Sequence, residues 1–324
     1  MNSSMNHEFT SRIFVINGAL LLLFAVLISI SNGLLLFTLY RDPLKTFRNA
    51  TAVLVAALGI TDLLTGLVTA VDVGISHIIE GLTNRQVMLQ AKIISQVTVR
   101  ASVFIMTMFA VERFIAVAFP YVYRFSITIQ KTVLGCVLCW VLAVISSCLE
   151  LLVERDLYDM IFLYITFVVP LLTVCLTYCS SYWLMQHKTK RLQRKHDSRK
   201  AKIPKESTKL QTQLMKTATL IVFFFVLSLL PFWSFTIVAR YCKSCIKETW
   251  FIACYRFSIP ILYSNSALNP LLYAWRMRSY RRSFLALFTG INRDPSRGHA
   301  YSSVVRYDTS VKDTTIHGDN DTKL

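Results

Sequence analysis

The stretch Ala50–Leu64, ATAVLVAALGITDLL, is almost wholly apolar, yet it contains one acid, Asp62, inside the run. In a membrane, a charged side chain at the centre of the bilayer costs about 2.5–3.5 kcal/mol or more. An acid at that depth is a functional-site hypothesis by default. The sequence therefore has to be interpreted around the role of Asp62.

Apolar residues dominate the whole chain of 324 residues. Hydrophobic residues make up 54% and charged residues 16%, with a mean hydropathy of +0.49, which excludes a soluble domain. A helix needs about 20 mostly apolar residues to cross the hydrocarbon. Seven stretches qualify: Ile13–Tyr40, Ala50–Ile75, Val87–Phe119, Thr132–Leu152, Leu157–Met185, Leu214–Ala239 and Trp250–Trp275. We predict an all-α membrane protein, a seven-transmembrane helix bundle with a short amphipathic eighth helix.

The net charge of +17 lies mainly on one side of the predicted membrane. Connections after the odd-numbered spans hold most of the Lys and Arg, with eleven from Lys188 to Lys216 alone. The positive-inside rule then places these loops in the cytoplasm and the N-terminus outside. Topology and attraction to anionic lipid headgroups explain the charge, so we expect membrane lipids and no nucleic acid as partners.

The chain divides into four predicted parts: a short extracellular N-terminus over residues 1–12, the seven-helix domain over 13–275, an amphipathic membrane-surface helix over 276–289 and a disordered cytoplasmic tail over 290–324. The first span follows Arg12 and lacks a small-residue cleavage site, which indicates a signal anchor. The tail ends Thr322-Lys323-Leu324, a candidate ligand for a PDZ domain.

Two features of the predicted outer face suggest covalent modification. Asn2-Ser3-Ser4 is a glycosylation sequon, with Asn2 as the acceptor. Cys242 and Cys245 fall in the outer loop before the last span, an oxidising place where a short-loop disulfide is expected. Cys254 is an alternative partner.

Each span carries a polar, tryptophan or proline marker. The third contains Glu112-Arg113-Phe114 and the seventh Asn269-Pro270-Leu271-Leu272-Tyr273, and the proline kinks its helix. The others are Asn32, Asp62, Trp140, Pro170 and Pro231. In this order and spacing, the set resembles a rhodopsin-like (class A) G-protein-coupled receptor from about Ile13 to Phe288.

The resemblance implies a plasma-membrane receptor with an agonist site that opens outward and a heterotrimeric G protein bound inside. Arrestin is a further expected partner. Met88 stands where most of the family has its disulfide cysteine, and the second outer loop is short. These features resemble the branch that holds melanocortin, adenosine, lysophospholipid and cannabinoid receptors, although no single branch fits.

The resemblance also explains the buried acid. In the family, a helix-two Asp, a helix-three Ser and two helix-seven Asn hold a sodium ion, and the matching residues are Asp62, Ser102, Asn265 and Asn269. Oxygen ligands suit a hard cation. The helical period of about 3.6 residues places Ser102 and Ser95 on the same stripe as Arg113. The alternative is a protonated Asp62 hydrogen-bonded to Asn32 and Asn269.

At the inner end, Arg113 is expected to pair with Glu112 at rest and to turn toward Tyr178 and the G protein on activation. Tyr121 follows Pro120 at the position where the family carries a hydrophobic plug for the G protein. The alternative for Arg113 is an arginine that snorkels to the interface. Helix six has no acid in its inner turn, which favours appreciable agonist-free activity.

Helix six departs from the family pattern. The family carries Cys-Trp-x-Pro, whereas this chain has Ser228-Leu229-Leu230-Pro231, without the Trp that senses ligand. Trp233 lies one turn above Leu229, with Phe225 one turn below. This stripe either couples ligand to helix motion or is ordinary bundle packing.

The ligand is left unassigned. Ser95 stands where amine receptors carry Asp, so a monoamine is not expected. The candidate ligand contacts are Asp72, His77, Glu80, Lys92, Ser95, Gln96, Trp233, Arg240 and Arg256. Arg100 faces helix four or five, with Glu150 as a candidate partner.

Three other functional classes differ from this interpretation in the features that they require. The missing helix-six Trp is compatible with an orphan receptor that acts without ligand or as a heteromer subunit. A transporter or channel would show inverted repeats, broken helices or charged rings, and the sequence has none of them. No catalytic set converges inside the bundle, so we do not expect an enzyme.

Overall fold

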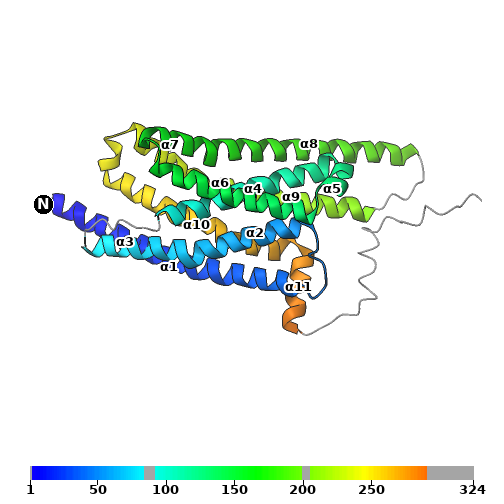
Figure 1. Cartoon of the computed structure of the whole chain (residues 1–324), viewed down its shortest axis with the longest axis horizontal. Coiled ribbons are helices and arrows are strands. Elements are labelled where there is room, and N and C mark those ends of the chain that lie inside the picture. The colour runs from blue at the N-terminus through cyan, green and yellow to red at the C-terminus, as the bar shows by residue number, and fades with distance from the viewer. Residues whose placement is uncertain (1, 84–91, 199–204, 290–324) are drawn as a thin grey trace, which may run out of the picture.

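The computed structural model describes residues 2–83, 92–198 and 205–289, and its regular structure in those ranges is helical (Figure 1). The long helices run roughly parallel, and α11 turns across one end of the bundle (Figure 1). The spanning elements are α1 (Asn2–Arg41), α2 (Ala50–Leu64) with η1 (Thr65–Ala70) and α3 (Val71–Thr83), α4 (Lys92–Ala118), α6 (Ile129–Cys148), α7 (Arg155–Leu163) with η3 (Tyr164–Val168) and α8 (Val169–Ser198), α9 (Lys205–Tyr241) and α10 (Thr249–Arg276). Shorter elements are α5 (Pro120–Ser126), η2 (Leu149–Leu151), η4 (Cys245–Lys247) and α11 (Arg278–Thr289).

Six helical segments of the described chain are long and apolar enough to cross a membrane. The seventh, α10, has 28 residues, or about 42 Å at 1.5 Å per residue. It is long enough to span but less apolar, because it carries Arg256 and several Ser and Asn side chains. The most polar spanning helix is therefore the last one.

The central helix of the bundle is α4, which contacts α2, α6, α8 and α9. Its buried Ile105, Met106 and Phe109 form one apolar cluster with side chains from those neighbours, including Val174 and Leu229. On the other side of the molecule, α1 packs against α2, α3 and α10.

Glycines allow α1 and α3 to approach closely. A Cβ atom on Gly18 would lie 2.5 Å from the carbonyl oxygen of Gly74, and one on Gly81 would lie 2.8 Å from that of Ser11. Small residues permit such contacts between membrane helices. Any larger side chain here would force the two helices apart.

Two of the spans contain a π-helical turn, η1 in helix two and η3 in helix five. Such a turn adds a residue to the local hydrogen-bond ring and is often found at functional sites. In helix two it separates Asp62 from Asp72, so the α-helical period of α2 does not carry through to α3.

Two observations differ from the boundaries expected from sequence. The first helix begins at Asn2 rather than Ile13, because the segment has no Pro or Gly and the Glu8–Arg12 pair, 2.6 Å apart, supports its turn. Helix two continues to Thr83.

The predicted tail, with Thr322-Lys323-Leu324, lies outside the described residues.

The short helix α11 follows α10 after Arg276 and has one buried and one exposed face. Tyr280 and Ser283 are buried, and the Ser283 hydroxyl lies 3.4 Å from that of Thr46. Leu285 and Phe288 are exposed beside Arg281 and Arg282. An exposed apolar edge with flanking cations is the pattern of a helix on a membrane surface.

Candidate functional site

Asp62 lies at the centre of the bundle with 0% of its surface exposed. The Ser266 hydroxyl donates to its Oδ1 at 2.7 Å, and the Asn269 amide donates to its Oδ2 at 2.9 Å. Both donors belong to α10. The carboxylate therefore joins helix two to helix seven through two hydrogen bonds.

A third helix joins the same group. The Asn32 amide of α1 donates to the backbone carbonyl of Ser266 at 3.0 Å and to that of Ile28 at 3.0 Å. The alternative in which Asn32 hydrogen-bonds a protonated Asp62 is thus not what the structure has at Asn32, because the Asn32 amide donates to main-chain carbonyls. Asn32 therefore binds α10, the helix that supplies both hydrogen-bond donors to Asp62.

The four predicted sodium ligands are only partly assembled. Asp62 and Asn269 are in contact, whereas Ser102 and Asn265 are buried but make no hydrogen bond to Asp62 in the described part of the chain. Asn32 Oδ1 and Asn269 Oδ1 are buried, and no described residue hydrogen-bonds them. A carboxyl group together with unpaired amide oxygens is a donor set that fits a hard cation.

Ser266 was missed as a contact of Asp62. It precedes Asn269 by one helical turn, so the two share a face. That spacing is present in the sequence and would have found it. Asn265, which was predicted instead, is the neighbour on the adjacent face.

Arg113 lies at the inner mouth in a compact polar group. It pairs with Glu112 and donates to the Thr51 hydroxyl on α2. Glu112 also accepts from Thr51 at 3.1 Å and from the Tyr123 hydroxyl at 2.6 Å. Glu112 and Arg113 are therefore tied to helix two and to α5, an arrangement that we call the inner latch (Thr51, Glu112, Arg113, Tyr123).

Two members of the inner latch, Thr51 and Tyr123, were not predicted. Burial is the main cause that raises the pKa of Tyr123 above its ordinary value, and the nearby Glu112 adds to it. The phenol therefore stays a neutral donor at physiological pH. Tyr121, the predicted plug, is 81% exposed on the same short helix, away from the latch.

Two other tyrosines of the predicted activation set lie deeper. Tyr178 of α8 and Tyr273 of α10 are both buried in the main apolar cluster. Their hydroxyl groups have no hydrogen-bond partner among the described residues. Both are thus available to a group that moves toward them.

The helix-six stripe is packed into the core. Phe225, Leu229 and Trp233 are all buried in the main apolar cluster. The Trp233 ring lies 4.9 Å from that of Phe162 and 5.3 Å from that of Phe167 in helix five. Trp233 therefore contacts helix five directly, and it is only 4% exposed.

The outer half of the bundle contains a closed polar ring. His77 Nδ1 lies 2.8 Å from Asn17 Oδ1, Arg256 Nη1 lies 2.9 Å from His77 Nε2, and Asn17 donates to the Arg256 carbonyl at 2.7 Å. Since Arg256 can only donate, His77 accepts at Nε2 and donates from Nδ1. The ring (Asn17, His77, Arg256) joins α1, α3 and α10.

Arg256 has further contacts beyond this ring. Its guanidinium lies 4.1 Å from the centre of the Phe14 ring and 3.8 Å from Glu80. Of the predicted ligand contacts, His77, Glu80 and Arg256 thus interact with one another. Sequence patterns gave no sign of this ring, because its members come from three distant helices.

A second buried cation lies between helices three, four and five. Arg100 donates to the Ser147 hydroxyl at 2.9 Å and to Tyr158, and its guanidinium lies 4.3 Å from the Phe162 ring centre. Gln96 accepts from Tyr158 at 3.1 Å. The side chain of Glu150, the predicted partner, lies outside what the structure describes.

The remaining predicted contacts are dispersed. The Ser95 hydroxyl lies 3.4 Å from that of Tyr263. Lys92 is the first residue of α4, but its side chain is not among those described. Arg240 lies in the last turn of α9. Met88 falls outside the described residues.

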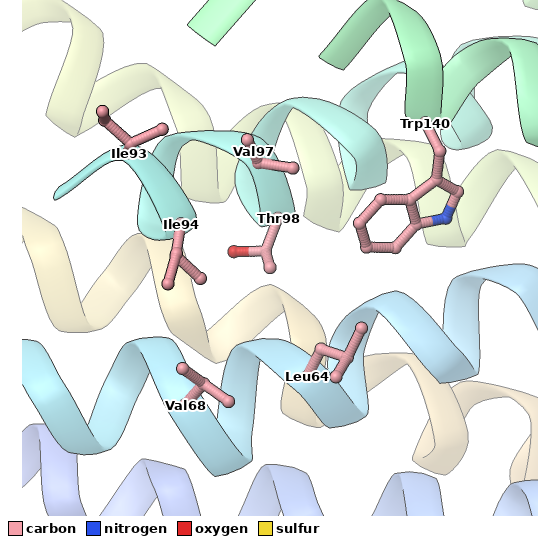
Figure 2. Close-up of a pocket in the computed structure, with 7 residues that line it drawn as sticks. All are labelled: Leu64, Val68, Ile93, Ile94, Val97, Thr98 and Trp140. Carbon is pink, nitrogen blue, oxygen red and sulfur yellow. The ribbon is translucent and has the colours of Figure 1, made fainter. Parts of the chain in front are cut away.

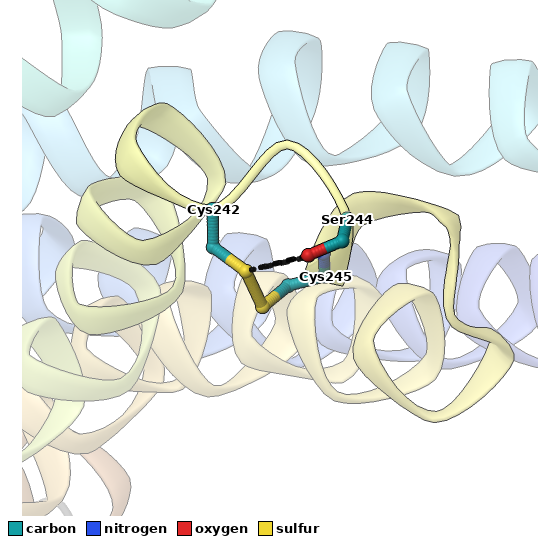
Figure 3. Close-up of a disulfide and its surroundings, with 3 residues drawn as sticks. All are labelled: Cys242, Ser244 and Cys245. Atoms are coloured by element: carbon teal, nitrogen blue, oxygen red, sulfur yellow. Dashed lines mark hydrogen bonds between the residues drawn. A yellow bond between two sulfur atoms is a disulfide. The ribbon is translucent and has the colours of Figure 1, made fainter.

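The outer loop between α9 and α10 is closed by a disulfide between Cys242 and Cys245, with the Ser244 hydroxyl 3.4 Å from Cys242 Sγ (Figure 3). Cys254, the alternative partner, is an exposed free thiol.

An apolar hollow lies between helices two, three and four, and the exposed side chains of Leu64 and Val68 line it (Figure 2). Trp140 and Thr98 complete its wall (Figure 2). None of the predicted ligand contacts lines it.

Comparison with known proteins supplies the family. Residues 31–273 match the family described as 7 transmembrane receptor (rhodopsin family). Human neuropeptide FF receptor 1 is 22% identical over 338 residues, covering 90% of this chain and 74% of that receptor. Sphingosine 1-phosphate receptor 3 of Takifugu rubripes is 25% identical over 214 residues, covering 60% of this chain and 51% of that receptor. Thyrotropin-releasing hormone receptor of Bos taurus is 24% identical over 271 residues, covering 67% of this chain and 66% of that receptor. The chain belongs to the rhodopsin family of seven-transmembrane, G-protein-coupled receptors.

Proposed function

We propose that this receptor lies in the plasma membrane with its N-terminus outside and passes an extracellular peptide or small-molecule signal to a heterotrimeric G protein. The inner latch carries the proposal. Arg113 is permanently charged, and an adjacent buried acid and hydroxyls from two other elements hold it in place. These contacts favour an arginine that is released on activation over one that extends to the membrane interface.

The resting state keeps Arg113 on Glu112. On activation, the inner end of helix six moves away, and Arg113 turns toward the unpaired Tyr178 hydroxyl and the G protein. Agonist and G protein each favour this open arrangement, so each raises the affinity of the receptor for the other. Tyr121, exposed on α5, is placed to meet the G protein.

The contact between helices two and seven links the two ends of the bundle. Asp62 fixes Ser266 and Asn269, and Asn269 precedes Pro270 and, one helical turn on, Tyr273. A shift of α10 must therefore break or rebuild hydrogen bonds at Asp62. A sodium ion, if bound, would neutralise the carboxylate. Asp62, Ser102, Asn265 and Asn269 are the residues that would hold it.

The relatives support more than one ligand class. Two are named for peptides and one for sphingosine 1-phosphate. Glycosylation at Asn2, arrestin binding and a PDZ partner at Thr322-Lys323-Leu324 are further proposals that rest on sequence.

A ligand-independent receptor or heteromer subunit is the second candidate. The observation that favours it is the burial of Trp233 against Phe162 and Phe167, which leaves helix six held by aromatic packing.

The test is nucleotide exchange on purified heterotrimeric G proteins, catalysed by the receptor in lipid nanodiscs. Basal exchange above that of empty nanodiscs is expected, and Arg113→Ala should abolish it without changing surface expression. Arg41→Ala is the matched control, because Arg41 is an exposed arginine at the cytoplasmic end of α1. Normal exchange by Arg113→Ala would overturn the assignment.

A further inference from the structure

Asp72 is a second carboxylate of helix two, and the residues around it do not compensate its charge. It lies in the first turn of α3, directly after the π-helical turn η1. Its Oδ2 is buried, and no described residue donates a hydrogen bond to it. No described Lys, Arg or His forms an ion pair with it either.

The nearest polar side chains offer hydroxyl groups rather than charge. The Tyr263 phenol of α10 is buried within electrostatic reach of Asp72, and its oxygen lies 3.4 Å from that of Ser95 on α4. One turn toward the membrane centre, the Thr69 and Thr98 hydroxyls lie 3.0 Å apart. Tyr263, which links helix seven to Ser95 of helix three, thus offers Asp72 a neutral hydroxyl rather than a charge.

The basic residue on the outer side of Asp72 is already engaged. Arg256 donates to His77 Nε2, lies near Glu80 and covers the Phe14 ring. Moving it to Asp72 would break the polar ring with His77 and Asn17. Arg256 is therefore not the counter-ion.

Asp72 is only partly buried, but a buried carboxylate oxygen without a donor is costly, and proteins usually pair such groups. Asp62 on the same helix is paired with two donors, so of these two acids only Asp72 has a buried oxygen that no described residue hydrogen-bonds.

We propose that Asp72 binds an organic cation, the ammonium or guanidinium group of the agonist, with the Ser95 and Tyr263 hydroxyls beside it. This inference rests on the proposed receptor function and adds the charge of the ligand. Family amine receptors carry this acid on helix three, at the position of Ser95. Here the negative charge is on helix two.

The test measures the charge preference of the site without a known ligand or a G protein. Ser95→Cys is made in a Cys254→Ser background, and the intact receptor is treated from outside with two thiol reagents. One is cationic, 2-(trimethylammonium)ethyl methanethiosulfonate, and the other anionic, 2-sulfonatoethyl methanethiosulfonate. The reaction of the Cys254→Ser parent, which lacks the new cysteine, is subtracted as background. The exposed thiol of Cys254 in the wild-type receptor gives the reference ratio of cationic to anionic reaction rates.

At Ser95→Cys, the ratio of the cationic to the anionic reaction rate should exceed the reference ratio by about tenfold or more. The reason is that a single nearby charge changes the relative rates by at least that much at low effective dielectric. Adding Asp72→Asn should return the ratio to the reference, and Asp72→Glu should keep the preference. Asp72→Ser replaces Asp72→Asn if that variant does not reach the surface.

Three results would overturn the proposal: no reaction from outside, a ratio equal to the reference, or a preference that survives loss of the Asp72 charge. A failure of nucleotide exchange with an intact charge preference would instead count against the proposed G-protein function alone.

Discussion

Asp62 and Asp72 lie on one helix, three turns apart, and their surroundings differ completely. Asp62 is fully buried, and both of its oxygens accept hydrogen bonds from helix seven. Asp72 has a buried oxygen that no described residue hydrogen-bonds. The first carboxylate is part of the bundle's internal structure, whereas the second has the features of a site that awaits a partner.

The difference arises from what helix seven presents at each level. Ser266 and Asn269 supply donors to Asp62, while Tyr263, one turn further out, is engaged with Ser95. The π-helical turn η1 between the two acids breaks the α-helical period of helix two. Two acids on one helix therefore face different neighbours.

The largest expected effect comes from truncating each acid. Asp62→Ala leaves two buried donors unpaired, at about 1–3 kcal/mol each, whereas Asp72→Ala removes an uncompensated charge. We predict that Asp62→Ala unfolds at a lower temperature than Asp72→Ala, by about 2 kcal/mol or more in stability. Thermal unfolding of the purified variants checks this, and equal stabilities would remove the distinction.

Sodium should act through only one of the two acids. An ion present at ten times its dissociation constant would stabilise the folded receptor by about 1.4 kcal/mol. The wild type should unfold at a higher temperature in sodium chloride than in potassium chloride of equal concentration. Asp62→Asn should lose this difference and Asp72→Asn should keep it. A sodium response that survives Asp62→Asn would support the protonated-acid alternative.

A third acid extends the comparison to the inner mouth. Glu112 has partners as Asp62 does, but from α2 and α5. Tyr123→Phe removes one hydrogen bond from the resting latch, about 1 kcal/mol, and should raise basal nucleotide exchange about fivefold. Tyr121→Phe, on the exposed side of the same helix, is the control. A lower basal rate for Tyr123→Phe would mean that the latch belongs to the active state.

Local patterns in the sequence predicted much of this. The resemblance to the receptor family placed Asp62 near Asn269. Hydrophobic runs gave the spanning helices, and Glu112 stands beside Arg113 in the chain. These features are regular along the chain, so the sequence alone reveals them. The ends of helices were less predictable, since the start of α1 depends on a Glu8–Arg12 pair rather than on hydropathy.

Contacts between distant segments were mostly missed. The ring of Asn17, His77 and Arg256 depends on the relative rotation of three helices, which no single-helix pattern specifies. The π-helical turn η1 also has no marker such as Pro in its sequence, yet it sets which neighbours Asp72 meets. Asn32 was a partner of Asp62 only in the protonated-acid alternative, and its amide donates to main-chain carbonyls instead.

The contact between Asp62 and Asn269 is the centre of the account, and exchanging the two residues tests it most directly. Asp62→Asn and Asn269→Asp should each lower both stability and basal nucleotide exchange. The double variant restores one carboxylate and one amide across the same gap and should recover most of both, with a coupling energy of about 0.6–1.7 kcal/mol. Strictly additive losses in the double variant would show that the two side chains do not act together, and would contradict the account.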